Sequence, residues 1–465
     1  MSRISMNLSG IERTLLNRLA EANAAATLSS LRMATGEMIN SPRDDPSAFV
    51  YLSGQQSQLS RVQETMDNVT AAASMVGQAQ STADEIRTQL SAIRTELLKW
   101  ESGTLTGSEQ SNIDAAITEI ENLVATEMDG KRLLDGSANF EISGRNSSQV
   151  TDVRVFSTGG ATVTVSGSVT AAATRAELTF TGSGGNVDTD ATFTLTGNTG
   201  SYEFTVTAAQ TLDNLATAIN DKSHETGVTA SVDADVLTFT SVEYGTDADV
   251  TIGVSDGTFI VAAGNTTSDA GTDVTATIDG QSYTGDGHQL SISDGVANYR
   301  LEFEPTFTGD FDTITVSGDA LTFALSTDLA RSTTLAIPGL HPAKLGGPSG
   351  SLSDLATGGS LAGLGDNASQ AIRVVDEALA DLTEVEGAID GFYNASVTSA
   401  SNFLADLEDD LEDAIDDVNL VDDTEEASRL VYYTGLASNS IAGLSILQNQ
   451  RAGIVRLIQK IAGLA

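Results

Sequence analysis

The chain opens with residues 1–26, MSRISMNLSGIERTLLNRLAEANAAA, and closes with residues 436–465, LASNSIAGLSILQNQRAGIVRLIQKIAGLA. In the first stretch apolar residues recur at steps of four, three, four and four, which places them on one face of a helix. These residues are Ile4, Leu8, Ile11, Leu15 and Leu19. The closing stretch has a similar stripe, made of Ile441, Leu444, Leu447, Val455, Ile458 and Ile461. The most regular apolar helices are therefore predicted at the two ends, where chains usually fray.

Between these ends the composition changes twice. Residues 1 to about 145 have a helical pattern, residues about 150–345 are rich in Thr, Gly, Val and Asp, and residues about 350–465 have a helical pattern again. No proline falls inside a proposed long helix, which agrees with this partition because proline breaks helices. The six prolines are Pro42, Pro46, Pro305, Pro338, Pro342 and Pro348.

The N-terminal region is expected to contain three helices. The first ends at the stretch Asn-Ser-Pro-Arg-Asp-Asp-Pro, residues 40–46, whose Asp and Pro can start a new helix. The second runs from Ser47 to about Trp100. The third follows a Gly/Thr turn and is expected to end at Met128-Asp-Gly130. In the C-terminal region, apolar steps from Ile372 to Val418 predict further helices before the terminal one.

The middle region alternates apolar and polar residues with a period of two, as in Tyr202, Phe204 and Val206, and Gly-rich turns separate the runs. One short helix is predicted at 211–220, with Leu212 and its neighbours on one face. The sequence thus predicts an α+β fold, with a β-rich insert between two helical arms. Because an apolar helical stripe must be buried, the first arm is expected to pair with the last.

The bulk composition excludes several functions. The formal net charge is −41, which argues against binding to nucleic acids or to anionic membrane surfaces. The absence of cysteine excludes disulfides, thiolate metal sites and a cysteine nucleophile. No apolar run of membrane-spanning length is present, so no membrane insertion is expected. Arg13 and Arg18 interrupt the N-terminal pattern, so a cleaved signal peptide is not expected either.

No motif predicts an active site, a cofactor site or a metal site, so the chain is not expected to be an enzyme. Acidic residues at 406–417 surround a stripe made of Leu407, Leu411 and Ile415; this pattern is typical of a solvated helix face. Weak cation screening there is the alternative. His224, His288 and His341 show no ligand spacing. Gly-rich runs such as 182–185 lack the Lys-Ser/Thr that a phosphate loop requires.

Five stretches, in this order along the chain, resemble those of bacterial flagellins. Residues 31–48, LRMATGEMINSPRDDPSA, and residues 63–68, QETMDN, are similar to the N-terminal flagellin signature. Residues 128–136, MDGKRLLDG, resemble the segment that closes the N-terminal arm. Residues 210–220, QTLDNLATAIN, resemble the flagellin hook IN motif, and residues 374–389, VVDEALADLTEVEGAI, resemble a C-terminal helix of the family.

The resemblance implies an assembly. In flagellins the two ends pair as a coiled coil (D0) that lines the inner tube of the filament, the adjoining helices form a rod (D1), and the insert projects outward (D2 or D3). It implies these boundaries: 1–42 and 426–465 for D0, 43–148 and 351–425 for D1, and 149–350 for the insert, with the hook IN-like motif at about 190–255. The eleven apolar residues of the terminal stripes would then form an assembly interface with other copies.

The resemblance also implies a function and partners. The chain is expected to polymerise into the flagellar filament outside the cell, after export without a cleaved signal peptide. Its partners would be copies of itself, a flagellar export chaperone, and hook-associated and cap proteins. Two alternatives stay open. The Asp-Asp-Pro at 44–46 is common in the hook-filament junction protein (hook-associated protein 3), and the acidic β insert is compatible with a receptor-binding module.

The C-terminal D1 helix departs from the family pattern at one position. Flagellins commonly carry an arginine before Gly-Ala in the C-terminal D1 helix, whereas this chain has Glu386 before Gly387 and Ala388. A basic residue is therefore replaced by an acid.

Overall fold

The computed structural model describes residues 10–104, 107–128, 130–137, 139–158, 162–259, 261, 267–293, 297–318, 320–328, 332–363 and 367–461. Ile4 and Leu8 of the N-terminal stripe lie outside the described residues. The chain divides into two compact units. The first consists of the N-terminal part up to residue 67 and the C-terminal part from residue 402, and the second consists of residues 68–401.

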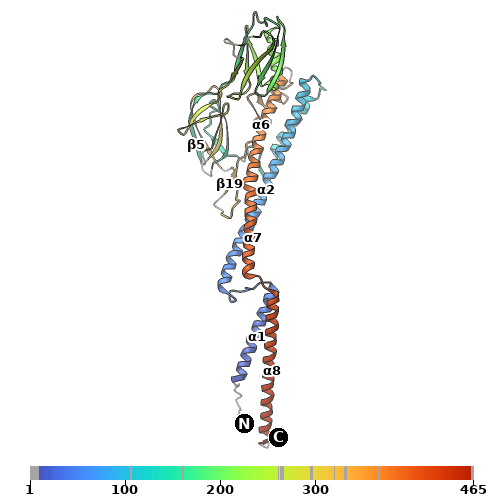
Figure 1. The fold of residues 1–465 in the computed structure, drawn as a ribbon, viewed down its shortest axis with the longest axis vertical. Helices are drawn as coiled ribbons and strands as arrows, with labels where there is room; N and C mark the ends of the chain where they lie inside the picture. Colours follow the sequence, from blue (N-terminus) through green and yellow to red (C-terminus); the bar gives the residue numbers. More distant parts are fainter. Residues whose placement is uncertain are drawn as a thin grey trace. The chain divides into compact units, whose positions relative to one another are not determined.

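The first unit brings together helices from the two ends of the chain. Helix α1 (Gly10–Thr35) lies along α8 (Asp423–Ile461), as Figure 1 shows. The unit also contains the beginning of α2 (Pro46–Glu101) and most of α7 (Ser399–Asn419). The prediction that the first arm pairs with the last is therefore confirmed for α1 and α8.

The break between α1 and α2 follows from local chemistry. Gly36 has a φ of +74°, the left-handed conformation in which glycine commonly ends a helix. The Asp45 carboxylate accepts hydrogen bonds from the backbone N–H groups of Ser47 and Ala48, both at 3.0 Å, and so caps α2. Pro46 occupies the first helical position, where no N–H is needed. The predicted turn at 40–46 is confirmed.

The loop between α1 and α2 contacts the connection between α7 and α8. Met38 N–H donates to the Asn419 carbonyl at 2.7 Å, and Ile39 N–H donates to Asn419 Oδ1 at 2.8 Å. Val421 N–H donates in turn to the Gly36 carbonyl at 3.2 Å. Asn419, which is buried, thus satisfies two backbone donors of the loop at once.

By length and composition alone, α8 is apolar enough to cross a membrane, with a mean hydropathy of 1.2 over an 18-residue window, and it is the single such helix among the described residues. The sequence analysis expects no membrane span because no uninterrupted apolar run is long enough. The mean hydropathy of an 18-residue window can be high without such a run. Ser438, Asn439 and Ser440 lie in the middle of α8 and α1 packs along it, so this is weak evidence for a membrane span.

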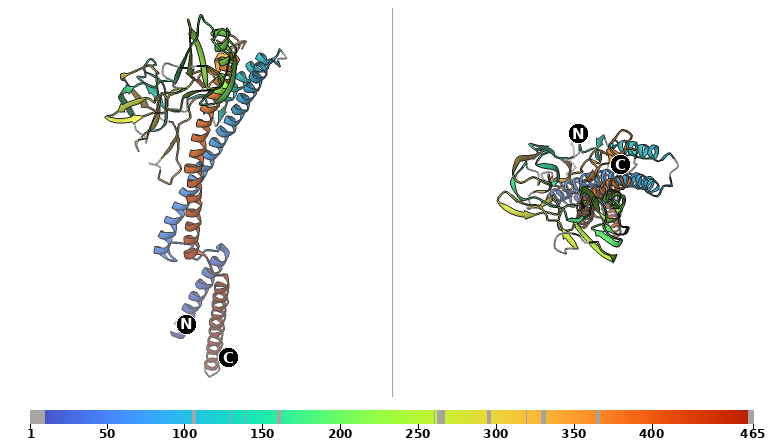
Figure 2. Two further views of the ribbon diagram at one scale, coloured as in Figure 1. Left: turned by 45° about the horizontal axis from the view of Figure 1, so that its top comes forward. Right: turned by 90° about the horizontal axis from the view of Figure 1, so that it is seen from above.

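In the second unit, long helices pack side by side (Figures 1 and 2). α2 continues here beside α6 (Ala368–Phe392), and α3 (Glu109–Val124) packs with them. A π-helical turn, Tyr393–Thr398, joins α6 to α7. The helix core contains fully buried aliphatic side chains, among them Ile86, Leu90, Ile93, Leu97, Ile113 and Ile120.

The third helix ends earlier than expected. α3 stops at Val124, and the next residues form a hairpin of β1 (Glu127–Met128) and β2 (Lys131–Arg132). Gly130 has a φ of +74°, which suits the turn of this hairpin and not a continuing helix. The expected helix end at Met128–Gly130 was wrong for this reason.

The insert contains two β modules, each with its own core. The first module combines a five-stranded antiparallel sheet of order β14-β13-β5-β17-β3 with a three-stranded sheet of order β15-β16-β4. Side chains of both sheets share one buried cluster that includes Val165, Leu301 and Ile314. The strands are β3 (Glu141–Ser143), β4 (Val150–Ser157), β5 (Val163–Ala171), β13 (Thr275–Ile278), β14 (Gln281–Thr284), β15 (Gln289–Ser293), β16 (Asn298–Phe303) and β17 (Gly309–Ser317).

The second module is inserted between β5 and β13 of the first. Its sheets have the orders β6-β10-β9 and β12-β11-β7-β8, and Phe193 stacks on Phe259 at 4.4 Å in their shared core. Leu212, Leu215 and Ile219 are buried on one face of α4, which confirms the short helix. The elements are β6 (Glu177–Thr181), β7 (Ala191–Gly197), β8 (Gly200–Val206), α4 (Leu212–Asp221), α5 (Ser223–Thr226), β9 (Val228–Asp233), β10 (Val236–Ser241), β11 (Asp249–Gly257) and β12 (Ser268–Ala270).

A chain of short elements leads from the first module to α6. Two small hairpins, β18–β19 and β20–β21, are followed by one 3-10 turn, η1. Their bounds are β18 (Leu321–Phe323), β19 (Thr333–Leu335), β20 (Gly346–Gly347), β21 (Gly350–Ser351) and η1 (Leu352–Leu355). The predicted α+β organisation, with a β-rich region between helical arms, is confirmed.

Candidate functional site

The seam between α1 and α8 follows a seven-residue repeat. In α8, buried and half-buried positions alternate at steps of four and three, the spacing of a coiled coil. They are Glu426, Leu430, Tyr433, Ala437, Ser440, Leu444, Leu447 and Arg451. The corresponding positions of α1 are Glu12, Leu15, Leu19, Ala22, Ala26 and Ser29. Small residues at the seam allow a close approach, and a Cβ on Gly443 would lie only 3.4 Å from a Leu15 methyl group.

Two ion pairs, one toward each end of the seam, fix the antiparallel register. Arg32 Nη1 lies 3.2 Å from Glu426 Oε1, and Arg451 Nη1 lies 3.1 Å from Glu12 Oε1. Burial alone would raise the pKa of Glu426, but hydrogen bonds from Ser29, Arg32 and Arg429 outweigh it and lower that pKa. The carboxylate is therefore held charged at the seam, where it favours this register over a shifted one.

The predicted stripe residues divide into two groups. Leu15, Leu19, Leu444 and Leu447 are half-buried at seam positions within the chain's own helix pair. The others in the described residues are exposed: Ile11, Ile441, Val455, Ile458 and Ile461, from 49% for Val455 to 79% for Ile461. The chain therefore uses part of the predicted stripe internally and leaves part of it exposed.

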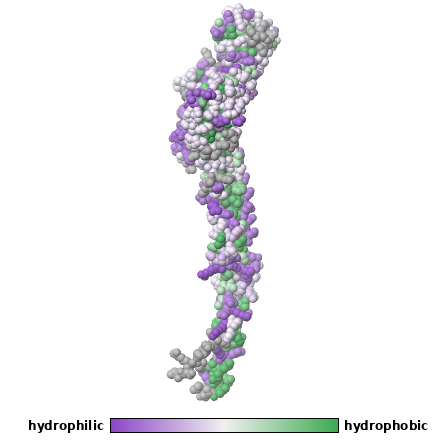
Figure 3. Space-filling view, turned by 90° about the vertical axis from the view of Figure 1, so that its left-hand side faces the viewer, coloured by the Kyte–Doolittle hydropathy of each residue, from purple (hydrophilic) through white to green (hydrophobic). Residues whose placement is uncertain are grey.

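Further large apolar side chains of α1 and α8 are exposed that the stripe did not include. The exposed apolar residues of α1 and α8 outside the stripe are Leu16, Leu31, Met33, Val431, Tyr432, Ile446, Ile454 and Leu457. Figure 3 shows hydrophobic surface along the helical part of the chain. A search for helices that are apolar on more than one face, instead of for a single seam, would have found them.

Ion pairs also join α2 to α6 in the second unit. The Arg87 guanidinium binds both oxygens of the Glu386 carboxylate, with Nε 3.0 Å from Oε1. Hydrogen bonding to Glu386 raises the pKa of Arg87. Arg94 Nε lies 2.6 Å from Asp376 Oδ1 in the same way. The acid at position 386, where flagellins commonly have arginine, is thus matched by a base on the facing helix.

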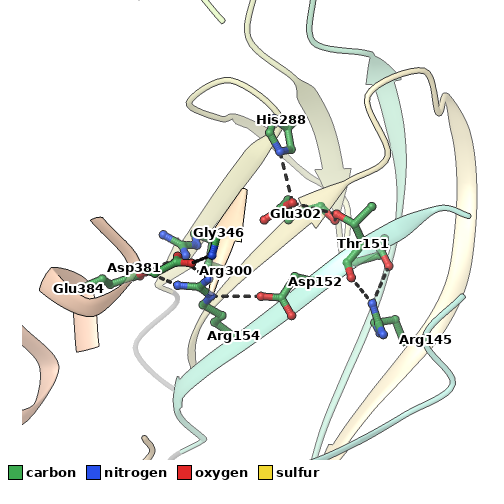
Figure 4. Close-up of polar contacts among 11 residues, drawn as sticks. Arg145, Thr151, Asp152, Arg154, His288, Arg300, Glu302, Gly346, Asp381 and Glu384 are labelled. Carbon is green, nitrogen blue, oxygen red and sulfur yellow. Dashed lines mark hydrogen bonds and ion pairs between the residues drawn. The ribbon is translucent and has the colours of Figure 1, made fainter. Parts of the chain in front are cut away.

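Two arginines attach the first β module to α6 (Figure 4). Arg154 on β4 donates to Asp381 at 2.6 Å and to Glu384 at 2.7 Å, and Arg300 on β16 donates to the same Glu384 oxygen at 2.7 Å. Burial opposes the charge of Arg154, but Asp381, Asp152 and Glu384 outweigh it and raise the pKa of Arg154. These pairs link residues more than 80 positions apart, and no local pattern in the sequence signals them.

A second polar group lies beside this anchor. His288 Nε2 lies 3.3 Å from Glu302 Oε1, and Thr151 Oγ1 donates to the same carboxylate at 3.1 Å (Figure 4). Burial would raise the pKa of Glu302, but the hydrogen bonds from His288 and Thr151 lower it. Glu302 and Asp381 both line a cavity of about 590 Å³ between β4, the end of β16, the residue 338–351 loop and α6.

One carboxylate of α6 is buried without full pairing. Glu377 Oε2 accepts a hydrogen bond from the Ser349 N–H at 3.2 Å, while Oε1 has no hydrogen-bond partner among the described residues. Burial raises the pKa of Glu377 to about 7, against the opposing hydrogen bond from Ser349. Arg373, one turn earlier, donates its Nε to Ser349 Oγ at 3.1 Å.

The acidic stretch at 406–417 and the three histidines do not form a site among the described residues. On α7, seven of the eight acids at 406–417 are exposed and Glu408 is half-buried, so the predicted solvated face is confirmed. Within the described residues no group of three or more His, Asp or Glu side chains could hold a metal ion. The three histidines lie apart in the fold: His224 contacts Ser369, His288 contacts Glu302, and His341 Nδ1 contacts Ala343 N.

Comparisons with solved structures find flagellar proteins at low similarity. The D2-D3 domains of the flagellar cap protein FliD from Escherichia coli are 19% identical, with a TM-score of 0.30, covering 39% of this chain and 100% of that chain. The D1-D2-D3 domains of the same protein are 16% identical, with a TM-score of 0.30 and coverages of 50% and 65%. Xanthomonas campestris FlgL is 10% identical, with a TM-score of 0.27 and coverages of 78% and 98%. Among curated proteins no sequence matches the chain.

Three family descriptions match along the chain in the expected order. The bacterial flagellin N-terminal helical region matches residues 6–139, the flagellin hook IN motif matches residues 192–243, and the bacterial flagellin C-terminal helical region matches residues 372–458. The hook IN match lies in the second β module and includes α4. The two helical matches include α1 and α8, whose seam and exposed apolar side chains are described above. The chain belongs to the bacterial flagellin family.

Proposed function

We propose that this chain is the structural subunit of a bacterial flagellar filament, in which α1 and α8 line the inner tube and the β modules face outward. Flagellins form the flagellar filament, which is extracellular, and the family is structural and non-enzymatic. The observation that carries the proposal is the exposure of large apolar side chains on α1 and α8. Ile441 is 56% exposed and Ile461 is 79% exposed, although both lie on the predicted stripe.

The physical argument is that a helix pair of this kind is incomplete alone. The internal seam uses one face of α8, and the residues outside it gain free energy only when another copy covers them. A head-to-tail contact that does not close into a ring produces an open helical polymer. The boundaries that the proposal assigns to D0, residues 1–42 and 426–465, fall close to the loop after α1 and the start of α8.

The test is seeded elongation of the full chain on filament fragments. Replacing Ile446, Ile454 and Ile458 by serine removes exposed apolar surface without touching the seam. Burying about half of an isoleucine contributes about 1 kcal/mol, so the triple variant should raise the critical concentration about a hundredfold. Replacing the exposed Gln448 and Gln450 by serine is the matched control and should leave elongation unchanged.

Deleting residues 1–40 or 436–465 should abolish growth while the β modules stay folded. Elongation of both truncated chains at the normal rate would contradict the proposal. The charge of −41 per subunit should also make assembly depend on ionic strength, because screening weakens repulsion between neighbouring copies.

The second candidate is the hook-filament junction protein. The Asp44-Asp45-Pro46 sequence favours it, because this sequence is common in junction proteins. In this chain Asp44 accepts a hydrogen bond from the Ser41 N–H at 2.8 Å, and Asp45 caps α2. Immunogold labelling of the native appendage separates the two. Label along the whole shaft supports the filament, and label confined to the joint supports the junction.

The filament proposal also includes partners and a route out of the cell. An export chaperone and cap proteins remain proposed partners, and export without a cleaved signal peptide remains part of the filament proposal.

A further inference from the structure

The two β modules are connected by two short segments that lie side by side. Residues 172–176 lead from β5 into β6, and residues 271–274 lead back from β12 into β13. The Thr174 N–H donates to the Thr272 carbonyl at 2.9 Å, and the hydroxyl groups of these two threonines are 2.8 Å apart. A connection this narrow lets two modules bend relative to each other unless further contacts prevent it.

A loop of the second module provides such contacts. It consists of residues 242–248, between β10 and β11. The Tyr244 side chain packs against the buried cluster of the first module, and its ring lies edge-to-face on His288, with 5.2 Å between the ring centres. The guanidinium of Arg175, in the first connecting segment, lies 4.3 Å from the centre of the Tyr244 ring. An aromatic residue of the second module thus packs on the core of the first.

The Asp273 carboxylate joins the same loop to the first module. Oδ1 accepts hydrogen bonds from the Thr246 N–H and the Gly287 N–H, both at 3.0 Å, and Oδ2 accepts one from the Thr246 hydroxyl at 2.7 Å. Thr246 belongs to the loop, and Gly287 lies in the turn between β14 and β15 of the first module. Burial opposes the charge of Asp273, but the hydrogen bonds from Thr246 and Gly287 outweigh it and lower the pKa of Asp273. One charged acceptor therefore holds parts of both modules.

Two glycines allow the loop and the turn to come this close. A Cβ on Gly245 would stand 2.4 Å from Asp273 Oδ1 and 2.6 Å from the Gly287 nitrogen. Gly287 has a φ of +57°, and a Cβ there would stand 2.8 Å from the Tyr244 carbonyl oxygen. A larger residue at either position would push the loop away from the first module, so the contact requires glycine at both.

We propose that residues 242–248 act as a latch, held by Tyr244 and by the Asp273 carboxylate, which keeps the two β modules in one fixed orientation. When the latch is released, the second module swings about the paired segments 172–176 and 271–274. The latch lies wholly within the second unit, so this proposal does not depend on the filament proposal.

The second module also touches the rod, through α5 and α6. Ser369 Oγ lies 2.9 Å from His224 Nδ1 and 3.1 Å from Ser223 Oγ, and Arg373 donates to the same Ser223 hydroxyl. These contacts are small and polar, whereas the latch combines a packed aromatic ring with a charged acceptor. We therefore expect the latch, and not the α5 contact, to set the orientation of the module.

The experiment is a pulsed EPR distance measurement on the full-length monomer with one spin label on each module. The chain has no cysteine, so Ser231→Cys on β9 and Ser291→Cys on β15, both at exposed positions, provide the two labelling sites. The distribution of label-to-label distances should have one narrow maximum in the chain that is otherwise unchanged. Tyr244→Ala combined with Asp273→Ala should turn it into a broad distribution, because the released module samples many orientations.

Hydrogen exchange provides a second measurement. Exchange of the Gly287 amide should be about tenfold faster or more in Asp273→Ala, because its charge-assisted hydrogen bond is lost. Asp273→Asn keeps a neutral acceptor and should accelerate this exchange less.

The matched controls change the same residue types away from the latch. Tyr202 packs on the core of its own module, and Asp190 Oδ1 accepts the Ala208 N–H at 2.7 Å within that module. Tyr202→Ala combined with Asp190→Ala should therefore leave the distance distribution narrow. Ser369→Ala, which removes the polar contact with α5, should leave it narrow as well.

Two outcomes would overturn the proposal: a broad distribution in the chain with an intact latch, or a narrow one in the combined Tyr244→Ala and Asp273→Ala variant. Exchange protection of β7 and β16 checks that both modules of this variant stay folded. If that protection is lost, Thr246→Val takes its place, since it removes only the hydroxyl bond to Asp273 at an exposed position. Thr246→Val should widen the distribution, and an unchanged width would count equally against the latch.

Discussion

Replacing Glu377 by glutamine is expected to stabilise the second unit at neutral and alkaline pH and to leave it unchanged at acidic pH. The Glu377 carboxylate is buried, with Ser349 N–H as its hydrogen-bond donor and Oε1 unpaired among the described residues. A Cβ on Gly347 would stand 2.9 Å from Oε2, so the loop packs directly against the carboxylate. A glutamine has nearly the same shape and can accept the Ser349 hydrogen bond without carrying a charge.

The magnitude follows from the pKa. Burial raises the pKa of Glu377 from 4.5 to about 7, so the folded state holds its proton more tightly than the unfolded state does. The stabilisation that the protonated form provides is complete below about pH 4.5 and is lost as pH rises to about 7. At about 1.4 kcal/mol per pKa unit, the loss amounts to about 3 kcal/mol. Above pH 7 the glutamine variant should therefore be more stable by about that amount.

The groups around Glu377 influence the pH range over which it loses its proton. Arg373 on the same helix favours the charged form and Glu243 from the second β module opposes it. Glu243 is itself half-buried; burial raises its pKa, and the charges of His288 and Arg175 oppose that rise. The Glu377 carboxylate thus has both a positive and a negative group nearby, and burial decides that its pKa is raised.

The assay is urea-dependent hydrogen exchange of the full chain, read on peptides from α6 at pH 5 and pH 8. At pH 8 the opening of α6 should be about a hundredfold less frequent in Glu377→Gln than in the wild type. Glu119→Gln, on the exposed face of α3, is the matched control and should change neither value. Parallel profiles of Glu377→Gln and wild type, within about 0.5 kcal/mol at both pH values, would show that the buried carboxylate does not govern this stability.

Three further predictions concern the helix pairs and the insert. The charge reversals Arg87→Glu and Glu386→Arg should each lower the free energy of unfolding of the second unit by about 1 kcal/mol or more. The double variant, in which the two charges are exchanged, should recover most of this loss. Urea unfolding of the four proteins measures the coupling energy, and a coupling energy of zero would refute the pairing. Asn419→Ala leaves the Ile39 N–H without its 2.8 Å acceptor and should cost about 1–3 kcal/mol, measured as faster hydrogen exchange at that amide. Leu215→Ala in the core of the second module should lower the unfolding free energy of that module by about 2–5 kcal/mol while seeded elongation proceeds normally; failed elongation would place the module in the assembly interface.

Local chemistry explains why much of the fold could be predicted. The spacing of Leu15 and Leu19 predicted a helix with a buried stripe, and the Asp45-Pro46 pair predicted the start of α2, because caps and periodicity act within a few residues. The short helix at 211–220 was predicted for the same reason. The end of α3 was missed, since the turn at Gly130 depends on strand pairing that a helical pattern does not reveal.

The sequence by itself determined the helical arms, the β-rich insert and the family resemblance, because periodicity, capping and short motifs are encoded in neighbouring residues. It did not determine which face of α8 the chain uses for itself: Ile11 and Ile441 fit the same stripe as Leu15 and Leu444, yet only the leucines are half-buried. Only the tertiary structure decided which charges meet, such as Arg87 with Glu386 and Arg154 with Asp381. Those pairs join residues hundreds of positions apart, and their energies depend on burial and distance, which folding alone supplies.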